Sequence, residues 1–476
     1  MKRAWQNFIN FHLPVLIFIT LVFFLSEKIN IGNGFGMDGQ TYGAIATDFL
    51  KKFSTINIRY IQRCLPSGII YIILTILGIP KNNPNIINSF IILNIISIGI
   101  VIYLWIKIAE FLNMSYKSKW FGIISLIGNY AILKWSSYYP VLTDIPSYAL
   151  GMSMVYFYLT NRPYLQLIIA AIGIFTFPLC AYFSLLLILY PRHIQIKYQK
   201  RVHRNFANQV FVGGVAVSLV LINYLIYNKI WSFSTFTSIL ISLTYIYLSY
   251  YYLSWSVGSI VALKYIFRIH QKLSVSVLAI LTISLIIFLQ NKFAISPVIG
   301  VTTLQGLLQN LSRYSITHPG VFITSHLIFF GPVLFYTIFL WKIVGLHINK
   351  NFGFGAILFI GLGILLSLDS ESRHLFFIFP FIVTVTVKEL DSQPHLYPSF
   401  YLFLFTSFWL SKLWLSIGNI VASKKDVYPD LLFYMHLGPW MLTPFYYMHL
   451  GVCILIGYLF YSQMQQSLKV SHEIKS

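Results

Sequence analysis

Long uncharged apolar stretches dominate the chain. Most of them reach the ~20 residues that a helix needs to cross a hydrocarbon layer about 30 Å thick. They lack the alternation of a barrel strand, and backbone groups in lipid must be satisfied within the segment, so helices are expected. The pattern predicts an all-α polytopic membrane protein with about 12 to 14 transmembrane helices. The clearest stretches cover residues 13–25, 86–106, 120–133, 206–228, 230–263, 314–341 and 431–468.

Composition and charge support the same class. The chain is 57% hydrophobic and 9% charged, which leaves too few charged residues to cover a soluble surface. A formal net charge of +21 would also suit a nucleic-acid partner, but cytoplasmic loops of membrane proteins are themselves rich in Lys and Arg. We therefore expect membrane lipids, and no nucleic acid, as partners. Three cysteines are too few to indicate a disulfide framework or a metal cluster.

The basic residues predict how the chain is threaded through the membrane. Residues 1–3, 107–119 and 191–205 are the most basic short segments, so we place them on the cytoplasmic side. Residues 13–25 resemble a signal peptide, but no small-residue cleavage site follows them, so we expect a retained first helix. The full threading gives about 14 spans with both termini in the cytoplasm.

Residues 27–85 become a long first external loop in this threading. Within it, residues 64–79 are too short to span and are expected to form an interfacial or re-entrant helix. Residues 120–135 then lead out and residues 145–160 lead back. Residues 164–190 have basic flanks that both belong inside, which predicts two short helices hinged near Pro178.

Three polar clusters fall on the external side of this threading, and Asp38 belongs to the first. Four glycines surround this carboxylate in residues 32–39, which would let the backbone approach a bulky ligand closely. Gln40 and Tyr42 follow as candidate substrate contacts. The alternative is a solvated loop after the first helix, where acidic residues are common.

The second cluster contains Tyr138, Tyr139 and Asp144. Asp144 lies at the start of a predicted helix, where Asp is an ordinary N-cap, and Pro146 in the first turn supports that interpretation. A role in the active site is compatible with a cap. Tyr138 and Tyr139 are candidates for stacking on a sugar ring.

The third cluster, residues 367–374, contains Glu371, Arg373 and His374. Arg373 and His374 would bind an anion, although the charged groups could equally neutralise one another. Arg59 and Arg63 are spaced i,i+4 in the first loop. They would grip a lipid phosphate, or extend among anionic headgroups.

The sequence gives little reason to expect a bound metal. No His-x-x-x-His or Cys-x-x-Cys pair occurs, although an all-oxygen site using Asp38 and Asp144 remains open. We expect no cofactor, with a divalent cation as the one possibility. His449 lies within the last apolar stretch, where an ionisable residue is a functional candidate, but neutral His is also tolerated there.

The order and the common side of these clusters resemble the GT-C superfamily of polytopic glycosyltransferases, nearest to bacterial members that build cell-surface glycans. The resemblance lies in Asp-Gly-x-x-Tyr-x-x-Ile-Ala at residues 38–46, Arg-x-x-x-Arg-x-x-Pro at residues 59–66, Tyr-Pro-x-x-x-Asp at residues 139–144, and Glu-x-Arg-His-Leu at residues 371–375 followed by Pro380. It covers residues 1–190 well and is patchy thereafter.

Two departures from the family pattern are evident. Many relatives carry a second acid directly after the first, where this chain has Gly39. Many also have a charged residue between the fifth and sixth helices, where this chain has Thr176, Phe177 and Pro178.

The resemblance implies an inverting sugar transfer from a polyprenyl-phosphate donor to a glycan, lipid or protein acceptor, without an obligatory metal. Asp38 would be the base, Asp144 would orient the acceptor or tune Asp38, and Arg373, Arg63 and His374 would stabilise the leaving phosphate. A transporter or flippase is the rival from another class. A catalytically inactive scaffold of the same fold is a third interpretation.

The resemblance also implies an organisation in two modules. Residues 1–205 would form the catalytic membrane module and residues 206–476 a variable C-terminal module with its external motif at residues 367–374. Nothing in the sequence suggests an organelle address, so a bacterial plasma membrane, with the active site on the external or periplasmic side, is expected.

Overall fold

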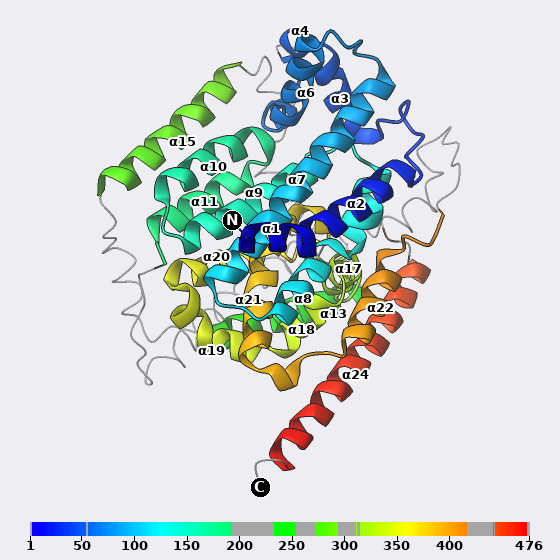
Figure 1. Cartoon of the computed structure of the whole chain (residues 1–476), viewed down its shortest axis with the longest axis vertical. Helices are drawn as coiled ribbons and strands as arrows, with labels where there is room; N and C mark the ends of the chain where they lie inside the picture. Colours follow the sequence, from blue (N-terminus) through cyan, green and yellow to red (C-terminus); the bar gives the residue numbers. More distant parts are fainter. Residues whose placement is uncertain are drawn as a thin grey trace.

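The structure is a computed structural model, and every regular element in the residues it describes is a helix (Figure 1). This confirms the all-α prediction for that part of the chain. The basic loop beyond Arg192 and the helix predicted at residues 206–226 lie outside the described residues. The described residues are 2–53, 56–192, 233–253, 273–293, 311, 315–416, 441 and 443–473.

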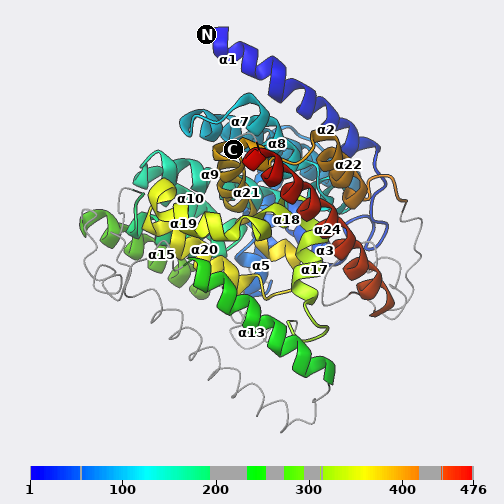
Figure 2. The same ribbon diagram turned by 90° about the horizontal axis from the view of Figure 1, so that it is seen from below.

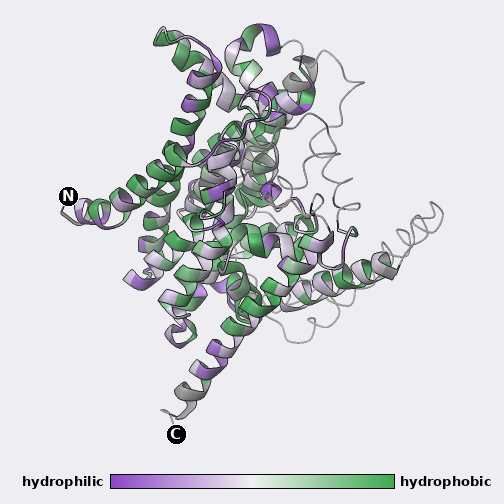
Figure 3. Cartoon of the chain, turned by 90° about the vertical axis from the view of Figure 1, so that its right-hand side faces the viewer, coloured by the Kyte–Doolittle hydropathy of each residue, from purple (hydrophilic) through white to green (hydrophobic). Residues whose placement is uncertain are grey.

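Three of the described helices are long and apolar enough to cross a membrane: Trp5–Leu25, Asn83–Phe111 and Thr443–Leu468. Further apolar helices of 10 to 17 residues accompany them. Hydrophobic residues make up much of most helices, with hydrophilic residues interspersed along them (Figure 3). The chain is therefore a helical membrane protein.

The N-terminal half contains the first long rod, the helices of the first loop and a central group of packed helices. Its elements are α1 (Lys2–Asn7), η1 (Phe8–His12), α2 (Leu13–Leu25), α3 (Met37–Thr47), α4 (Phe49–Phe53), α5 (Ile58–Ile61), α6 (Leu65–Ile76), α7 (Asn83–Phe111), α8 (Tyr116–Ile127), η2 (Ala131–Ser136), α9 (Asp144–Leu159), α10 (Pro163–Thr176) and α11 (Leu179–Leu189).

The C-terminal half continues the bundle and ends in the longest described helix. Its elements are α13 (Phe233–Leu253), α15 (Leu273–Phe293), α17 (Val321–Phe330), α18 (Val333–Phe339), α19 (Trp341–Phe352), α20 (Phe354–Leu366), η4 (Ser372–Leu375), α21 (Phe379–Ser392), η5 (Pro394–Leu396), α22 (Phe400–Ser411) and α24 (Thr443–Glu473). Seen from below, the α1–α2 rod and α13 lie on opposite sides of the bundle (Figure 2).

Several elements match their predictions closely. The first apolar stretch becomes α2 with the same bounds. The hinge near Pro178 is confirmed, because α10 ends at Thr176 and α11 begins at Leu179. In the first loop, α6 has 12 residues and is about 18 Å long, shorter than the hydrocarbon layer. Figure 1 shows α3, α4 and α6 together at one end of the molecule.

Two predicted continuous helices are broken in the structure. The stretch at residues 120–135 is interrupted after Ile127, where α8 gives way to the π-helical turn η2. Asn129 bridges the break, because its side chain accepts a hydrogen bond from the Ile132 backbone N–H (3.1 Å) and donates to the Ser125 carbonyl (2.9 Å). The stretch at residues 314–341 is divided into α17 and α18, with Gly331 at a φ of 78° between them.

The central packing brings the late segment around η4 against α9. A Cβ atom on Gly151 would lie 2.2 Å from the Phe377 carbonyl oxygen, so only glycine allows this approach. Tyr148, one turn earlier, stacks on Phe379 with ring centroids 6.3 Å apart and donates a hydrogen bond to the Leu126 carbonyl (3.0 Å). These contacts place the segment that carries Glu371 and Arg373 beside the start of α9.

Candidate active site

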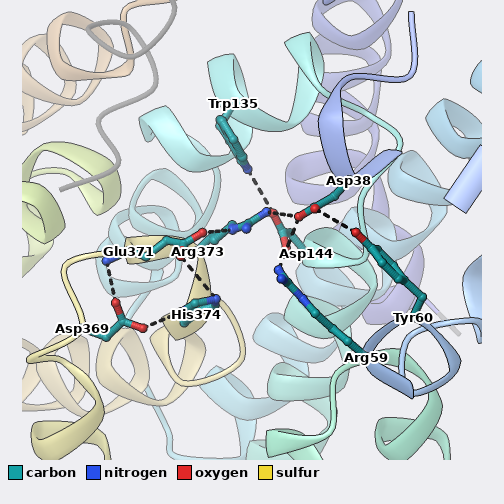
Figure 4. Close-up of polar contacts among 9 residues, drawn as sticks. All are labelled: Asp38, Arg59, Tyr60, Trp135, Asp144, Asp369, Glu371, Arg373 and His374. Carbon is teal, nitrogen blue, oxygen red and sulfur yellow. Dashed lines mark hydrogen bonds and ion pairs between the residues drawn. The ribbon is translucent and has the colours of Figure 1, made fainter. Parts of the chain in front are cut away.

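Segments far apart in the sequence meet at the carboxylate of Asp38, in the first turn of α3 (Figure 4). Arg373, which follows it by 335 residues, donates from Nη1 to Asp38 Oδ2 at 3.3 Å. The Arg59 guanidinium lies 3.7 Å from the same oxygen. The Tyr60 hydroxyl donates to Asp38 Oδ1 at 3.3 Å. The first and third predicted clusters therefore form one site.

Arg373 is at the centre of this site, and its side chain is 12% exposed. Its Nε donates a short hydrogen bond to Glu371, and its guanidinium also interacts electrostatically with Asp144. Burial alone would lower the pKa of Arg373, but Glu371, Asp38 and Asp144 raise it well above its usual value. A guanidinium held among three carboxylates is permanently charged and fixed in position.

The charge state of Asp38 follows from these contacts. Burial would raise the pKa of this carboxyl, but the guanidinium groups of Arg373, Arg59 and Arg63 outweigh burial and hold the pKa below its usual value. The pKa of Glu371 is also lowered, because Arg373 and His374 outweigh the effect of burial. Both groups are ionised at neutral pH.

Asp144 joins the cluster from the first turn of α9, and it is 4% exposed. The prediction that it is the N-cap is wrong. Thr143 occupies the cap position without a side-chain hydrogen bond, and Asp144 is already helical. The Asp144 carboxylate instead accepts a hydrogen bond from the Trp135 indole N–H at 3.0 Å and interacts with Arg373 and Arg63. Its side chain is thus committed to the site rather than to the helix end.

Arg63 contributes a second buried guanidinium. It is 5% exposed, although it lies two residues beyond the end of the short helix α5 that carries Arg59. Its guanidinium carbon is 5.0 Å above the centre of the Phe177 ring, and the group lies beside the Tyr42 hydroxyl. Within the described part of the chain, Arg63 Nε has no hydrogen-bond partner. An unpaired buried donor of this kind is a place where an anion would be stabilised.

His374 is held on the other side of Glu371. Its Nδ1 lies 2.6 Å from Asp369 Oδ2, and its Nε2 lies 3.8 Å from a Glu371 oxygen. The Asp369 carboxylate also accepts a hydrogen bond from the Glu371 backbone N–H at 3.1 Å. The acids and bases of this segment therefore neutralise one another, as one of the two alternatives predicted, while Arg373 also reaches Asp38.

The two departures from the family pattern both have a structural counterpart. A Cβ atom on Gly39 would lie 3.0 Å from the Val141 carbonyl oxygen and 3.1 Å from the Tyr139 ring, so a second acid would be tightly confined there. The Tyr139 hydroxyl instead accepts a hydrogen bond from the Gly39 backbone N–H at 2.9 Å. At the other departure, Phe177 supplies the ring face that supports Arg63.

The structure does not bring every candidate to the cluster. Gln40 is exposed, and its side chain lies over Gly32 rather than toward Asp38. Tyr138 and Tyr139 are 2% and 4% exposed, so protein covers the ring faces that were predicted to stack on a sugar. Tyr42 is also buried, and its hydroxyl contacts the Arg63 side chain.

Four contributors were not anticipated from the sequence: Tyr60, Trp135, Phe177 as a support, and Asp369 as the partner of His374. Tyr60 was adjacent to a named arginine, and Asp369 lay inside a named motif. Trp135 had no signal, because its position depends on the break in the helix at residues 128–130.

Among the described residues, no three His, Cys, Asp or Glu side chains are grouped so as to hold a metal ion. His449 lies in α24 and is 2% exposed. Its Nε2 is 3.0 Å from Lys412 Nζ and its Nδ1 is 2.6 Å from the Phe445 carbonyl oxygen. Both ring nitrogens of His449 thus have partners, and neither partner belongs to the Asp38 cluster.

No family model, curated protein or solved structure matches this chain. The class is therefore the one that the fold and the site define: a helical membrane protein with a buried cluster of carboxylates and guanidinium groups.

Proposed function

We propose that this chain transfers a sugar from a polyprenyl-phosphate donor to an acceptor hydroxyl at the external face of the membrane, in the assembly of a cell-surface glycan. The observation that carries the proposal is the meeting of two guanidinium groups at one carboxylate, with Arg59 3.7 Å and Arg373 3.3 Å from Asp38 Oδ2. Such a site offers an anion-binding group and a proton acceptor side by side. It is built from the segments on which the resemblance to GT-C glycosyltransferases rests.

The arginines provide what departure of a phosphate requires. As the bond between the sugar and the phosphate breaks, negative charge grows on the leaving group, and fixed cations lower the energy of that state. Arg373 is held rigidly by Glu371, and Arg63 has an unpaired Nε within the described structure. Arg59, whose side chain is 41% exposed, is the most accessible of the three.

Asp38 is the proposed base, and its contacts suggest how it becomes active. A carboxylate with a lowered pKa is a weak base, and the arginines cause that lowering. A donor phosphate that binds Arg373 and Arg59 would neutralise part of their charge and so raise the pKa of Asp38. The acceptor hydroxyl would then lose its proton to Asp38 as it attacks the anomeric carbon from the face opposite the phosphate, which inverts the configuration. Asp144 would orient the acceptor.

A cavity near the site suits the hydrocarbon part of the donor. It has a volume of about 740 Å³, is lined almost entirely by apolar side chains of α13, α17, α18, α20 and α21, and reaches Ser367 beside the η4 segment. Ligand pockets are typically 300–1,000 Å³. His326 in its wall hydrogen-bonds Ser372, which lies between Glu371 and Arg373. A chain bound there would begin close to the arginines.

The proposal includes the threading predicted from the basic residues: 12 to 14 spans in a plasma membrane, both termini in the cytoplasm and the site outside. No cofactor is needed for this chemistry. Residues 206–476 would contribute Arg373 and Glu371 to a site otherwise built from residues 1–205, so both modules would be required for activity.

The test compares purified wild type, Asp38→Asn and a control, Asp391→Asn, on a panel of radiolabelled polyprenyl-phosphate sugars with crude acceptor lipids. Asp391 lies in the last turn of α21, where it accepts hydrogen bonds from Ser115 and Ser118. We expect donor consumption by wild type and by the control, and none by Asp38→Asn.

Other outcomes would redirect the proposal. Donor binding without consumption by wild type would favour the inactive scaffold, a rival that the confined Gly39 position keeps open. If donors neither bind nor react, sugar transfer is excluded, and uptake by proteoliposomes would test the transporter alternative.

A further inference from the structure

The break between α8 and α9 contains a π-helical turn, η2, whose six residues are all buried, and two of them, Lys134 and Trp135, contact different parts of the molecule. Lys134 is 3% exposed and Trp135 is 2% exposed. A π-helical turn has one residue more than an α-helical turn, and such turns are frequent at functional sites. The extra residue changes the direction in which the side chains of the turn point. Contacts with other segments are therefore needed to fix the rotation of the turn.

Lys134 provides that fixation. Its Nζ lies 2.7 Å from Glu27 Oε1 and donates to the Leu415 carbonyl at 2.6 Å. Glu27 in turn accepts a hydrogen bond from Ser416 Oγ at 3.0 Å. One ammonium group thus ties together the end of the first rod, the π-helical turn and the segment after α22. A buried Lys keeps its charge only when paired in this way.

Trp135 projects from the same turn toward the candidate active site. Its indole N–H donates to Asp144 Oδ2 at 3.0 Å, and its ring meets Tyr139 edge-on with centroids 5.5 Å apart. Tyr139 accepts the hydrogen bond from Gly39, the residue after Asp38. The turn therefore contacts Asp144 directly and the Asp38 segment through Tyr139.

We propose that Lys134 and Trp135 are positioning residues for Asp144. The buried contacts of Lys134 set the rotation of the π-helical turn, and the turn aims the Trp135 indole at one carboxylate oxygen. The other oxygen of Asp144 is thereby presented to Arg373 and the acceptor. Neighbouring residues on one turn cannot move independently, so loss of the Lys134 contacts misdirects Trp135. The catalytic consequence rests on the proposed function, whereas the positioning itself does not.

The first experiment measures positioning without activity. Full-length protein labelled with ¹⁵N-tryptophan gives one indole N–H signal per Trp, and Trp135→Phe identifies that of Trp135. We expect Asp144→Asn and Lys134→Met each to shift this signal. The control Lys388→Met should leave it in place, because Lys388 has partners of the same kind elsewhere, the Leu112 carbonyl at 3.2 Å and Asp391 at 3.7 Å. An unchanged Trp135 signal in Lys134→Met would overturn the proposal.

Glu27→Gln is the second variant if Lys134→Met does not fold. It keeps an oxygen that can accept from Lys134 but removes the charge, so the Trp135 signal should shift in the same direction and by less. No shift in this folded variant would also count against the proposal.

The second experiment measures turnover. Trp135→Phe and Lys134→Met should lower kcat by about 10- to 100-fold, the scale of a displacement near 1 Å, with donor KM within about twofold because the arginines are untouched. The control Trp105→Phe removes a comparable buried indole hydrogen bond, to the Lys119 carbonyl, and should keep kcat. Full kcat in Trp135→Phe would overturn the positioning role. Absence of turnover in wild type would instead exclude the proposed function. The positioning of Trp135 would then be tested by the indole N–H signal alone.

Discussion

Two buried acidic groups, Glu389 in α21 and Glu371 in the segment that leads into it, are satisfied in different ways. Near the C-terminal end, Glu389 is 1% exposed, and its two oxygens pair with His347 Nδ1 at 3.0 Å and Asn351 Nδ2 at 3.1 Å. Both partners come from α19. Just before the N-terminal end, Glu371 shares Arg373 with Asp38 and Asp144, which come from α3 and α9.

The difference separates a closed set of buried polar groups from one that is open to a further partner. Glu389 and its two partners form a closed set between two neighbouring helices, with one donor for each oxygen. Around Asp38 the set is not closed, because three carboxylates share Arg373 and Arg63 Nε has no partner in the described structure. A buried guanidinium N–H without a partner can still accept an anion as its hydrogen-bond partner.

The largest expected effect comes from removing the shared cation. Arg373→Met should lower the free energy of unfolding by about 3–5 kcal/mol, because the buried carboxyl groups of Glu371 and Asp144 lose their main cation, whereas Asp38 keeps Arg59. The double variant Arg373→Met/Glu371→Gln should recover part of that loss. Unfolding in detergent micelles measures both. Equal stability of the single and double variants would show that the charges do not interact as described.

Next in size is the contrast in activity between the two acids. Asp38→Asn should lower kcat by about 10²- to 10⁴-fold, the usual contribution of a general base. Glu389→Gln, an equally conservative change at the paired acid in α21, should keep kcat within about twofold. The same donor-consumption assay serves both. If Glu389→Gln is as inactive as Asp38→Asn, the distinction between the two acidic groups is wrong.

A smaller effect is expected from filling the space beside Asp38. Gly39→Ala places a Cβ atom 3.0 Å from the Val141 carbonyl oxygen, so the free energy of unfolding should fall by about 1–3 kcal/mol. Gly78→Ala is a control for the loss of a glycine, because its Cβ would meet nothing within 4 Å. The φ of 64° at Gly78 adds backbone strain to this variant, which sets an upper limit on the cost of losing a glycine without a clash. A Gly39→Ala variant as stable as wild type would mean that position 39 has room for the missing acid.

The smallest effect is a difference in acid sensitivity. The pKa of Asp38 is lower in the folded chain than its unfolded value of about 3.9, so its ion pairs stabilise the fold fully above that pH and the contribution is lost as pH falls through the folded pKa. Below about pH 4, wild type should therefore lose stability more steeply than Asp38→Asn. Parallel pH profiles of the unfolding midpoint would show that Asp38 is not ion-paired.

The sequence predicted helices wherever an apolar stretch was uniform, as at α2 and α7, and where a proline marked a hinge, as between α10 and α11. It failed where a helix breaks inside an apolar stretch. Ile127 and Ala131 look like parts of one span, and the break between them depends on Asn129 finding partners on both sides. Such tertiary satisfaction of the backbone leaves no periodic signal in the sequence.

For the site, the sequence supplied Asp38, Arg59, Arg63, Asp144 and Arg373, because charged residues are rare in an apolar chain and their presence is itself a signal. Their mutual contacts needed the fold. Residue types that are common throughout the chain gave no such signal. Trp135 is one of 10 tryptophans and Phe177 one of 41 phenylalanines, so neither could be singled out.

The separation of 335 residues between Asp38 and Arg373 also determines how long Asp38 exists in the growing chain before Arg373 is synthesised. At ribosomal rates of 5–20 residues per second, roughly 20 to 70 s pass between synthesis of the acid and synthesis of its main cation. During that interval the only arginines available from the same loop are Arg59 and Arg63. They would give the Asp38 carboxylate its first arginine partners, before they take up their part in the finished site.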